Sequence, residues 1–264
     1  MAKSNFVNLV FVIDESGSMY SSQEDIIGGF NKTIDEQRAV EDGECVVSLY
    51  KFSDGVDKVF IGKSLDEIKP LTKGDNCHWS SFSSASIVVN ADGTTSYKSE
   101  TIYNDVDKTF TYDPHGCTAM NDGIGTAIDE IGKWLSDMPE EERPSKTVFV
   151  IMTDGYENVS KQYTLSQVRE MIKHQTEKYN WTFVYMGMDI STKDTADSLG
   201  INTRSFSSKS SHDTFMNYKN ISDSVSVYRC ADVCCADAMF TSNLTTSLDE
   251  MTKTYESATG IKIS

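Results

Sequence analysis

The sequence predicts an α/β fold in which a mostly parallel, doubly wound sheet of six strands carries helices on both faces. Residues 9–13 and 147–153 are short apolar runs rich in β-branched residues, which is typical of strands buried on both faces. Segments with apolar residues at helical spacing, such as 124–135, separate these runs. This alternation of strands and helices favours a parallel sheet with right-handed crossovers.

The first quarter of the chain supplies one strand, one helix and a hairpin. A strand at 9–13 leads into a helix that we expect to begin with a capping box at Ser21–Glu24. Residues 45–52 read as the second strand and residues 58–62 as the third. Because a connection this short forces an antiparallel pair, the third strand is predicted to lie at an edge of the sheet.

Residues 72–110 are predicted to be an insertion. Its segments 86–90 and 95–99 read as the strands of a β-hairpin, because Ala91–Thr94 between them has the composition of a tight turn. The surrounding residues are polar and rich in serine. Two interpretations stay open: a binding element, or an ornament that caps an edge and binds nothing.

The remaining elements continue the alternation. A helix follows residue 118, the fourth strand covers 146–153, and a helix capped by Thr164–Gln167 precedes a fifth strand at 181–188. A brief helix at 195–199 and a sixth strand around 204–206 complete the predicted domain, which spans residues 1–207. Residues 208–264 are predicted to be a mainly helical extension. We expect its first part to pack back on the domain, and a partner-binding arm is the alternative.

Charge and composition limit the kinds of partner. The chain carries 40 acidic and 24 basic residues, a net charge of −16, which argues against duplex nucleic acid or an anionic membrane as its main partner. No leader-like segment or membrane-length apolar run is visible, so a cytoplasmic location is expected. The six cysteines show no zinc-like pairing with histidine, and we expect them to be reduced and structural.

Polar side chains follow the first strand at a regular spacing. Asp14, Ser16 and Ser18 place one carboxylate and two hydroxyls at the strand's carboxyl end. An all-oxygen set suits a hard divalent cation and offers little to zinc or copper. Taken alone, Asp-x-Ser-x-Ser is also common in ordinary turns, so this stretch by itself does not decide between the two.

Two further stretches support a metal site. Thr118 lies in the loop 116–119, directly before a helix, and Asp154 follows the fourth buried strand and precedes a glycine. Together with Asp14, Ser16 and Ser18, these residues resemble the von Willebrand factor type A family and its metal-ion-dependent adhesion site. All five positions of that motif are matched over roughly the first two hundred residues, in the manner of small intracellular bacterial and phage members. The 72–110 insertion departs from the family pattern and is expected to project near the metal-bearing face.

The resemblance implies the strand order 3-2-1-4-5-6, with Asp14 and Asp154 meeting where the order reverses. It also implies a Mg²⁺ ion, with Mn²⁺ or Ca²⁺ as alternatives, that coordinates an Asp or Glu of a partner protein. The predicted function is therefore metal-dependent protein binding. The alternative is a structural or scaffolding component, for instance of a phage, in which the ion only stabilises the loops.

An enzyme is not expected. No nucleophile–base pair and no Walker loop accompany the candidate ligands, so we predict no catalytic residue and no organic cofactor. Asp122 is interpreted as a helix-capping residue, because an acid is favoured at a helix N-terminus. Glu15 and Glu157 are expected at the rim of the site, and His115 on a loop surface. Because the surface is acidic, the partner is expected to surround its coordinating acid with positive charge.

Overall fold

The computed structural model describes residues 3–74, 83–89, 95–101, 108–154, 156–187, 192–201, 205–207, 210–230, 238–240, 242–243 and 248–259. Five parallel strands and one antiparallel edge strand form the central sheet, in the order β10-β9-β8-β1-β2-β3. These strands are β1 (Lys3–Asp14), β2 (Glu44–Phe52), β3 (Val56–Ser64), β8 (Pro144–Thr153), β9 (Thr182–Gly187) and β10 (Ser205–Ser207). The order corresponds to the one that the family resemblance implies, and the antiparallel edge is the one predicted from the short connection before β3.

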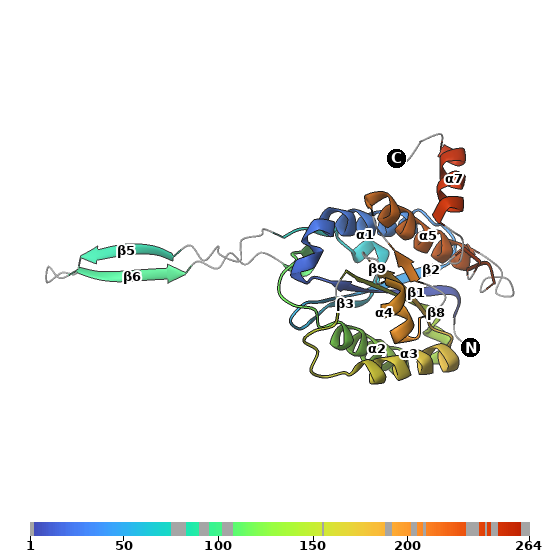
Figure 1. Ribbon diagram of the computed structural model, residues 1–264, viewed down its shortest axis with the longest axis horizontal. Coiled ribbons are helices and arrows are strands. Elements are labelled where there is room, and N and C mark those ends of the chain that lie inside the picture. Colours follow the sequence, from blue (N-terminus) through green and yellow to red (C-terminus); the bar gives the residue numbers. More distant parts are fainter. Residues whose placement is uncertain are drawn as a thin grey trace.

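Helices cover both faces of this sheet (Figure 1). Helices α1 (Gln23–Arg38) and α5 (Ser211–Cys230) lie on one face. Helices α2 (Met120–Asp137), α3 (Leu165–Tyr179) and α4 (Thr192–Leu199) lie on the other. The α/β class with helices on both faces is therefore confirmed.

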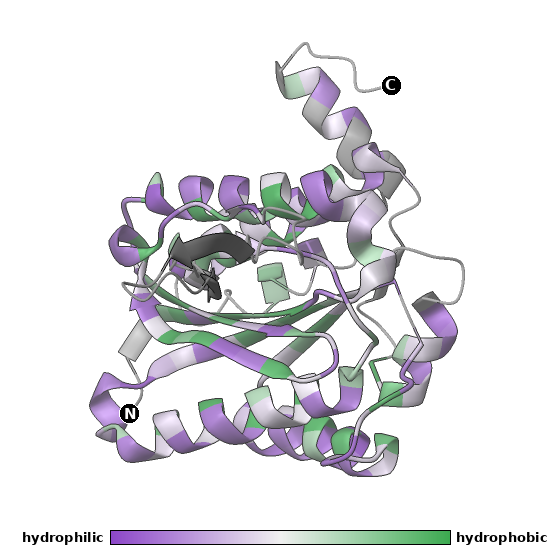
Figure 2. Ribbon diagram, turned by 90° about the vertical axis from the view of Figure 1, so that its left-hand side faces the viewer, coloured by the Kyte–Doolittle hydropathy of each residue, from purple (hydrophilic) through white to green (hydrophobic). Residues whose placement is uncertain are grey.

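Strand β1 supplies side chains to both layers of the core. Leu9 and Phe11 belong to the cluster beneath α1 and α5, whereas Val10 and Val12 belong to the cluster beneath α2 and α3. In Figure 2 the strands are largely hydrophobic between two helical layers whose outer sides are hydrophilic. An uninterrupted apolar run, without alternation, is the pattern that such a doubly covered strand requires.

Capping boxes are predicted at the starts of α3 and α1, and only the one at α3 is present. Thr164 and Gln167 form the expected capping box at α3, with the Gln167 amide donating to Thr164 Oγ1 at 3.3 Å. The box predicted at Ser21–Glu24 is wrong, because Gly17–Ser22 forms a 3₁₀ turn (η1) that carries Ser21 inside it. Helix α1 then begins after Ser22, whose side chain makes no capping hydrogen bond.

The insertion contains a hairpin and a short base. Strands β5 (Ser83–Val89) and β6 (Thr95–Thr101) pair antiparallel in a sheet of their own, drawn apart from the central one in Figure 1. The turn predicted at 91–94 lies outside the described residues. At the base, β4 (Thr72–Lys73) pairs in parallel with β7 (Thr111–Tyr112). Short 3₁₀ turns lie at Leu65–Glu67, Lys108–Phe110 and Glu140–Glu142.

Beyond residue 207, the chain returns to the domain. Tyr218, Ile221 and Val225 of α5 are buried in the core cluster shared with α1, and the Tyr218 hydroxyl donates to the Ile26 carbonyl at 3.2 Å. The first part of the extension therefore packs back as expected, while the division at residue 207 stays a prediction. Helix α7 (Leu248–Thr259) follows. Within the described residues, no helix combines the length and apolarity needed to cross a bilayer.

Candidate functional site

The site lies where β1 and β8 end side by side. These neighbouring parallel strands are paired through Ile13 and Met152, so the residues that follow them reach the same edge of the sheet. Asp14 and Asp154 are 140 residues apart in the sequence and meet there. The reversal of strand order at this edge opens a place for a ligand beyond the strand ends.

A chain of hydrogen bonds connects four of the five predicted ligands. Asp14 Oδ1 accepts the Ser16 amide at 2.7 Å, and the hydroxyls of Ser16 and Ser18 lie 3.1 Å apart. Ser18 donates its hydroxyl to Asp154 Oδ1 at 2.6 Å. Asp14 and Ser16 are buried, Asp154 is partly buried and Ser18 is exposed. The cluster therefore runs from the end of the buried strand out to solvent.

The fifth candidate, Thr118, lies in a loop that contacts the Asp14 segment. The Gly17 amide donates to the Gly116 carbonyl at 3.2 Å, which joins the two loops. Asn158 holds Thr118 through two hydrogen bonds. Its side-chain Oδ1 accepts the Thr118 backbone amide at 2.9 Å, and its backbone amide donates to the Thr118 carbonyl at 3.1 Å. Thr118 is buried, as Asp14 and Ser16 are.

Burial raises the pKa of Asp14 to about 6, although hydrogen bonds from Thr153 and Ser16 oppose this shift. The charge of Asp154 raises the pKa further. Among the described residues, no basic side chain forms an ion pair with Asp14. A buried carboxylate next to a second carboxylate, without a cationic side chain, is an environment that a bound cation would stabilise.

The donor set fits a hard cation. Two carboxylates and three hydroxyls offer only oxygen, which suits Mg²⁺ or Ca²⁺ better than soft metals. In the part of the chain that the structure describes, no group of three or more His, Cys, Asp or Glu side chains is arranged to bind a metal. The candidate centre is thus built mainly from hydroxyls.

Two residues that sequence reasoning missed support Asp14 directly. Thr153 donates its hydroxyl to Asp14 Oδ2 at 2.5 Å, and the Tyr112 hydroxyl donates to the Asp14 carbonyl at 2.6 Å. Thr153 gave a weak signal, as a polar residue closing a buried apolar strand beside Asp154. Tyr112 gave none, because it lies at the base of the insertion, 98 residues from Asp14.

Glu15 is not at the rim, contrary to expectation. It is 3% exposed and pairs with Lys51, which is 6% exposed, across 3.0 Å. The same Glu15 oxygen accepts the Asp113 amide at 2.7 Å, and Lys51 Nζ donates to the Thr111 carbonyl at 2.9 Å. Burial raises the pKa of Glu15, and Lys51 counteracts that shift. The pair therefore joins the ends of β1 and β2 to the base of the insertion.

Asp122 and Glu157 also have roles that their spacing did not reveal. Asp122 lies in the first turn of α2, the helix start where an acid is expected, but α2 has no side-chain capping hydrogen bond. Its oxygens accept the backbone amides of Lys161, Gln162 and Tyr163, each at 2.8 Å, so it also holds a distant loop. It makes no hydrogen bond to the candidate ligands among the described residues.

Glu157 accepts the Asn121 amide at 2.8 Å and the Ser160 amide and hydroxyl at 2.7 Å. Its carboxylate thus holds this loop together, and its expected place at the rim of the site stays a prediction. His115 is partly buried and lies in the loop before Thr118, with Nδ1 at 2.6 Å from the Asp113 carbonyl oxygen. The hydrogen bonds of Glu157 with Asn121 and Ser160 fix the loop that carries Asn158 against the start of α2.

The sequence and the fold match those of known proteins. It belongs to the von Willebrand factor type A domain family, whose model matches residues 8–225, a match that extends into α5. Domains of this family often mediate metal-dependent adhesion or protein binding. No curated protein sequence matches the chain.

Solved structures share the fold at low sequence identity. The pilus adhesin SpaC of Lactobacillus rhamnosus GG matches with a TM-score of 0.55 and 13% identity, over 85% of this chain and 30% of that protein. The PilB minor pilin of Streptococcus sanguinis matches with a TM-score of 0.51 and 13% identity, over 83% of this chain and 61% of that protein. Proximal thread matrix protein 1 from the mussel byssus matches with a TM-score of 0.50 and 16% identity, over 84% of this chain and 46% of that protein. At identities of 13–16% the likeness shows the fold alone. The chain spans less than two thirds of each of these proteins.

Proposed function

We propose that this protein binds a divalent cation, Mg²⁺ in the first instance, and that the ion coordinates an Asp or Glu of a partner protein. Asp14, Ser16, Ser18, Thr118 and Asp154 are the proposed ligands. The observation that carries the proposal is the hydrogen-bonded chain from buried Asp14 through the two serines to Asp154. It brings oxygen atoms from two distant segments to the solvent-facing edge of the sheet.

The chemistry of the donors supports an open ion. Mg²⁺ takes six oxygen ligands at about 2.0–2.1 Å and retains several waters in most protein sites. Neutral hydroxyls from Ser16, Ser18 and Thr118 leave more positive charge on the ion than carboxylates would. A strongly electrophilic ion near exposed Ser18 can accept a carboxylate from outside the chain. We propose no catalytic role for these residues, because holding an ion that binds a partner's carboxylate requires no reaction.

The structural alternative predicts different behaviour. If the ion only stabilises the loops, Mg²⁺ raises the free energy of unfolding by an amount set by its concentration and dissociation constant, without changing any association. If the ion is a bridge, association with the partner also depends on it. Thermal stability and partner binding therefore have to be measured separately.

The first test compares the wild type with Asp14→Asn in Mg²⁺ and in EDTA. Asp14→Asn keeps the shape of the side chain and removes its charge, so we expect Mg²⁺ binding measured by calorimetry to be lost with the fold retained. Asp66→Asn is the matched control, because Asp66 is an exposed acid of the 3₁₀ turn Leu65–Glu67. Partner proteins retained from native cells by the wild type should be absent with EDTA and with Asp14→Asn.

Two outcomes would count against the proposal. Undiminished Mg²⁺ affinity in Asp14→Asn would remove Asp14 from the ligand set. Partners that are retained equally in Mg²⁺ and in EDTA, while Mg²⁺ still raises the melting temperature, would favour the structural alternative.

A further inference from the structure

We propose that Tyr20 and Tyr156 form an aromatic rim beside the metal centre, and that it selects a partner whose coordinating acid stands next to an Arg or Lys. The cationic side chain would lie on these rings while the acid reaches the ion. This inference rests on the proposed function and adds to it the chemistry of the partner.

The first observation is where exposed aromatic side chains occur. Tyr20 is 57% exposed and Tyr156 is 66% exposed, a high value for large hydrophobic side chains. Each stands two residues after a candidate ligand, Tyr20 after Ser18 and Tyr156 after Asp154. Since the Ser18 hydroxyl donates to Asp154 at 2.6 Å, the two short segments that carry the rings start from touching residues.

The second observation is that one ring already attracts a cation. Lys73 Nζ lies 5.8 Å from the centre of the Tyr20 ring, within the range of a cation–π contact. Lys73 is held only loosely, because its sole ion pair among the described residues is with exposed Glu24 at 4.0 Å. An Arg or Lys of a partner could therefore displace Lys73. The contact also shows that the Tyr20 ring accepts a cationic side chain.

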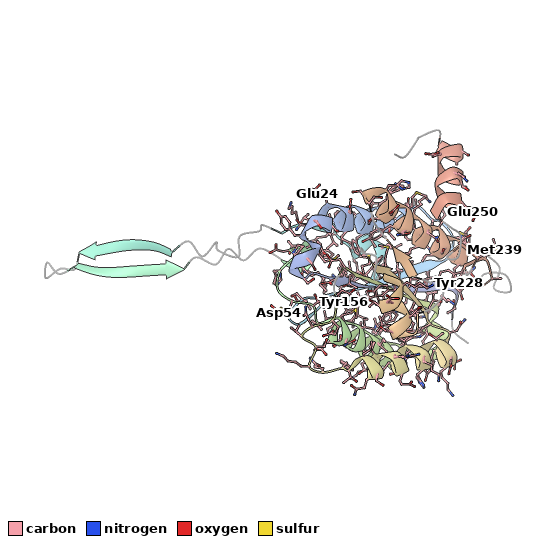
Figure 3. The ribbon with its side chains drawn as sticks, viewed as in Figure 1. Glu24, Asp54, Tyr156, Tyr228, Met239 and Glu250 are labelled. Carbon is pink, nitrogen blue, oxygen red and sulfur yellow. The ribbon has the colours of Figure 1, made fainter. Side chains whose placement is uncertain are left out.

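The third observation is the charge of the surrounding surface. Figure 3 places Glu24, Asp54 and Tyr156 on the same side of the molecule. Asp54 is exposed, and hydrogen bonds from Cys117 hold the pKa of its carboxyl below the ordinary value, so it stays ionised. A lone acidic side chain approaching this face of a protein with net charge −16 would be repelled at long range. A neighbouring cation on the partner offsets that repulsion, and its side chain can lie on the exposed rings.

Synthetic peptides test the inference without knowledge of the natural partner. The probes are fluorescent Gly/Ser nonapeptides with one central Asp, flanked on both sides by Arg or by citrulline, the uncharged isostere of Arg. A third probe replaces Asp by Asn between the Arg residues. Binding is measured by fluorescence anisotropy in Mg²⁺ and in EDTA at fixed ionic strength.

We expect the Arg-flanked Asp peptide to bind more tightly than the citrulline-flanked one in Mg²⁺. Tyr156→Leu and Tyr20→Leu should each reduce this ratio of affinities by about two- to fivefold, the range of an exposed cation–π contact. Tyr156→Phe keeps the ring and should keep the ratio. Tyr179→Leu is the matched control, because Tyr179 is 59% exposed at the end of α3 and outside the site.

The outcomes separate this inference from the function on which it rests. Magnesium-dependent binding of both Asp peptides with equal affinity, or a ratio unchanged in Tyr156→Leu and Tyr20→Leu, would overturn the aromatic rim and leave metal-dependent binding intact. Binding that ignores EDTA, or that is as tight for the Asn peptide, would overturn the proposed function itself. Absence of binding by every peptide up to millimolar concentration would overturn both.

Discussion

Lys51→Met should destabilise the protein by about 3–5 kcal/mol, the cost of removing one partner from a buried ion pair. Lys51 and Glu15 are 6% and 3% exposed, with Nζ and Oε1 3.0 Å apart. Methionine fills much of the volume of the lysine but leaves the Glu15 carboxylate buried. The Asp113 amide is then its remaining hydrogen-bond donor among the described residues. The Thr111 carbonyl also loses the Lys51 hydrogen bond of 2.9 Å.

Urea unfolding measures this loss directly, as a lower midpoint with an unchanged slope. For a domain of this size each kcal/mol corresponds to roughly 2–4 °C, so the melting temperature should fall by about 6–20 °C. Lys58→Met is the matched control. Lys58 pairs with Glu130 at 3.1 Å on the surface, where such a pair contributes about 0–1 kcal/mol.

A double-mutant cycle separates the pair from the packing around it. Glu15→Gln removes the buried charge, so Lys51→Met combined with Glu15→Gln should lose less stability than the two single changes added together. Losses that add within about 0.5 kcal/mol would refute the reasoning, as would a Lys51→Met variant no less stable than Lys58→Met. Either result would mean that the pair does not stabilise the junction between the strand ends and the base of the insertion.

Three further predictions concern α1, a buried thiol and the support of Asp14. Gly29→Ala should cost about 1–3 kcal/mol in urea unfolding, because its Cβ would lie 2.1 Å from the Tyr218 ring in the tight contact between α1 and α5. Burial raises the pKa of the Cys45 thiol from 9.0 to about 12, so the native state keeps a proton that the unfolded chain loses above pH 9. Stability should therefore fall by roughly 1 kcal/mol between pH 8 and pH 10 from this group. Thr153→Val should weaken Mg²⁺ binding by about 10–100-fold in calorimetry, since it removes a hydroxyl that orients the proposed ligand Asp14.

Each of these predictions has a control within the chain. Gly28→Ala places its Cβ in open space and should gain stability, so equal effects at 28 and 29 would contradict the steric argument. The alkaline loss should shrink in Cys45→Ala relative to the wild type, and parallel pH profiles would show that the thiol does not contribute. Thr147→Val alters a buried threonine near the other end of β8, and a similar loss of Mg²⁺ affinity there would point to general weakening of the strand.

The succession of strands and helices along the chain could be predicted because local sequence patterns indicate each element. The apolar run ending at Asp14 and the one ending before Asp154 identify strands covered on both faces, and β1 indeed feeds both core layers. The short connection at Ser53–Gly55 predicts the antiparallel edge, and the β2–β3 pairing confirms it. Such signals act over a few residues, so they need no knowledge of the rest of the chain. Where two local signals compete, as at Ser21, the 3₁₀ turn that follows the Asp14 loop overrides the capping pattern.

What the sequence determined by itself is therefore the class of fold, the succession of strands and helices, and the oxygen-bearing residues that end β1 and β8. Only the tertiary structure decided how those residues are held. Glu15 lies buried against Lys51, and Asp122 holds the backbone of a loop 39 to 41 residues away. The physical reason is that a carboxylate in a short motif can face solvent, a metal, a lysine or an amide with nearly the same local spacing. The choice is made by whichever partner the packed sheet brings within hydrogen-bonding distance, and that partner comes from a distant part of the chain.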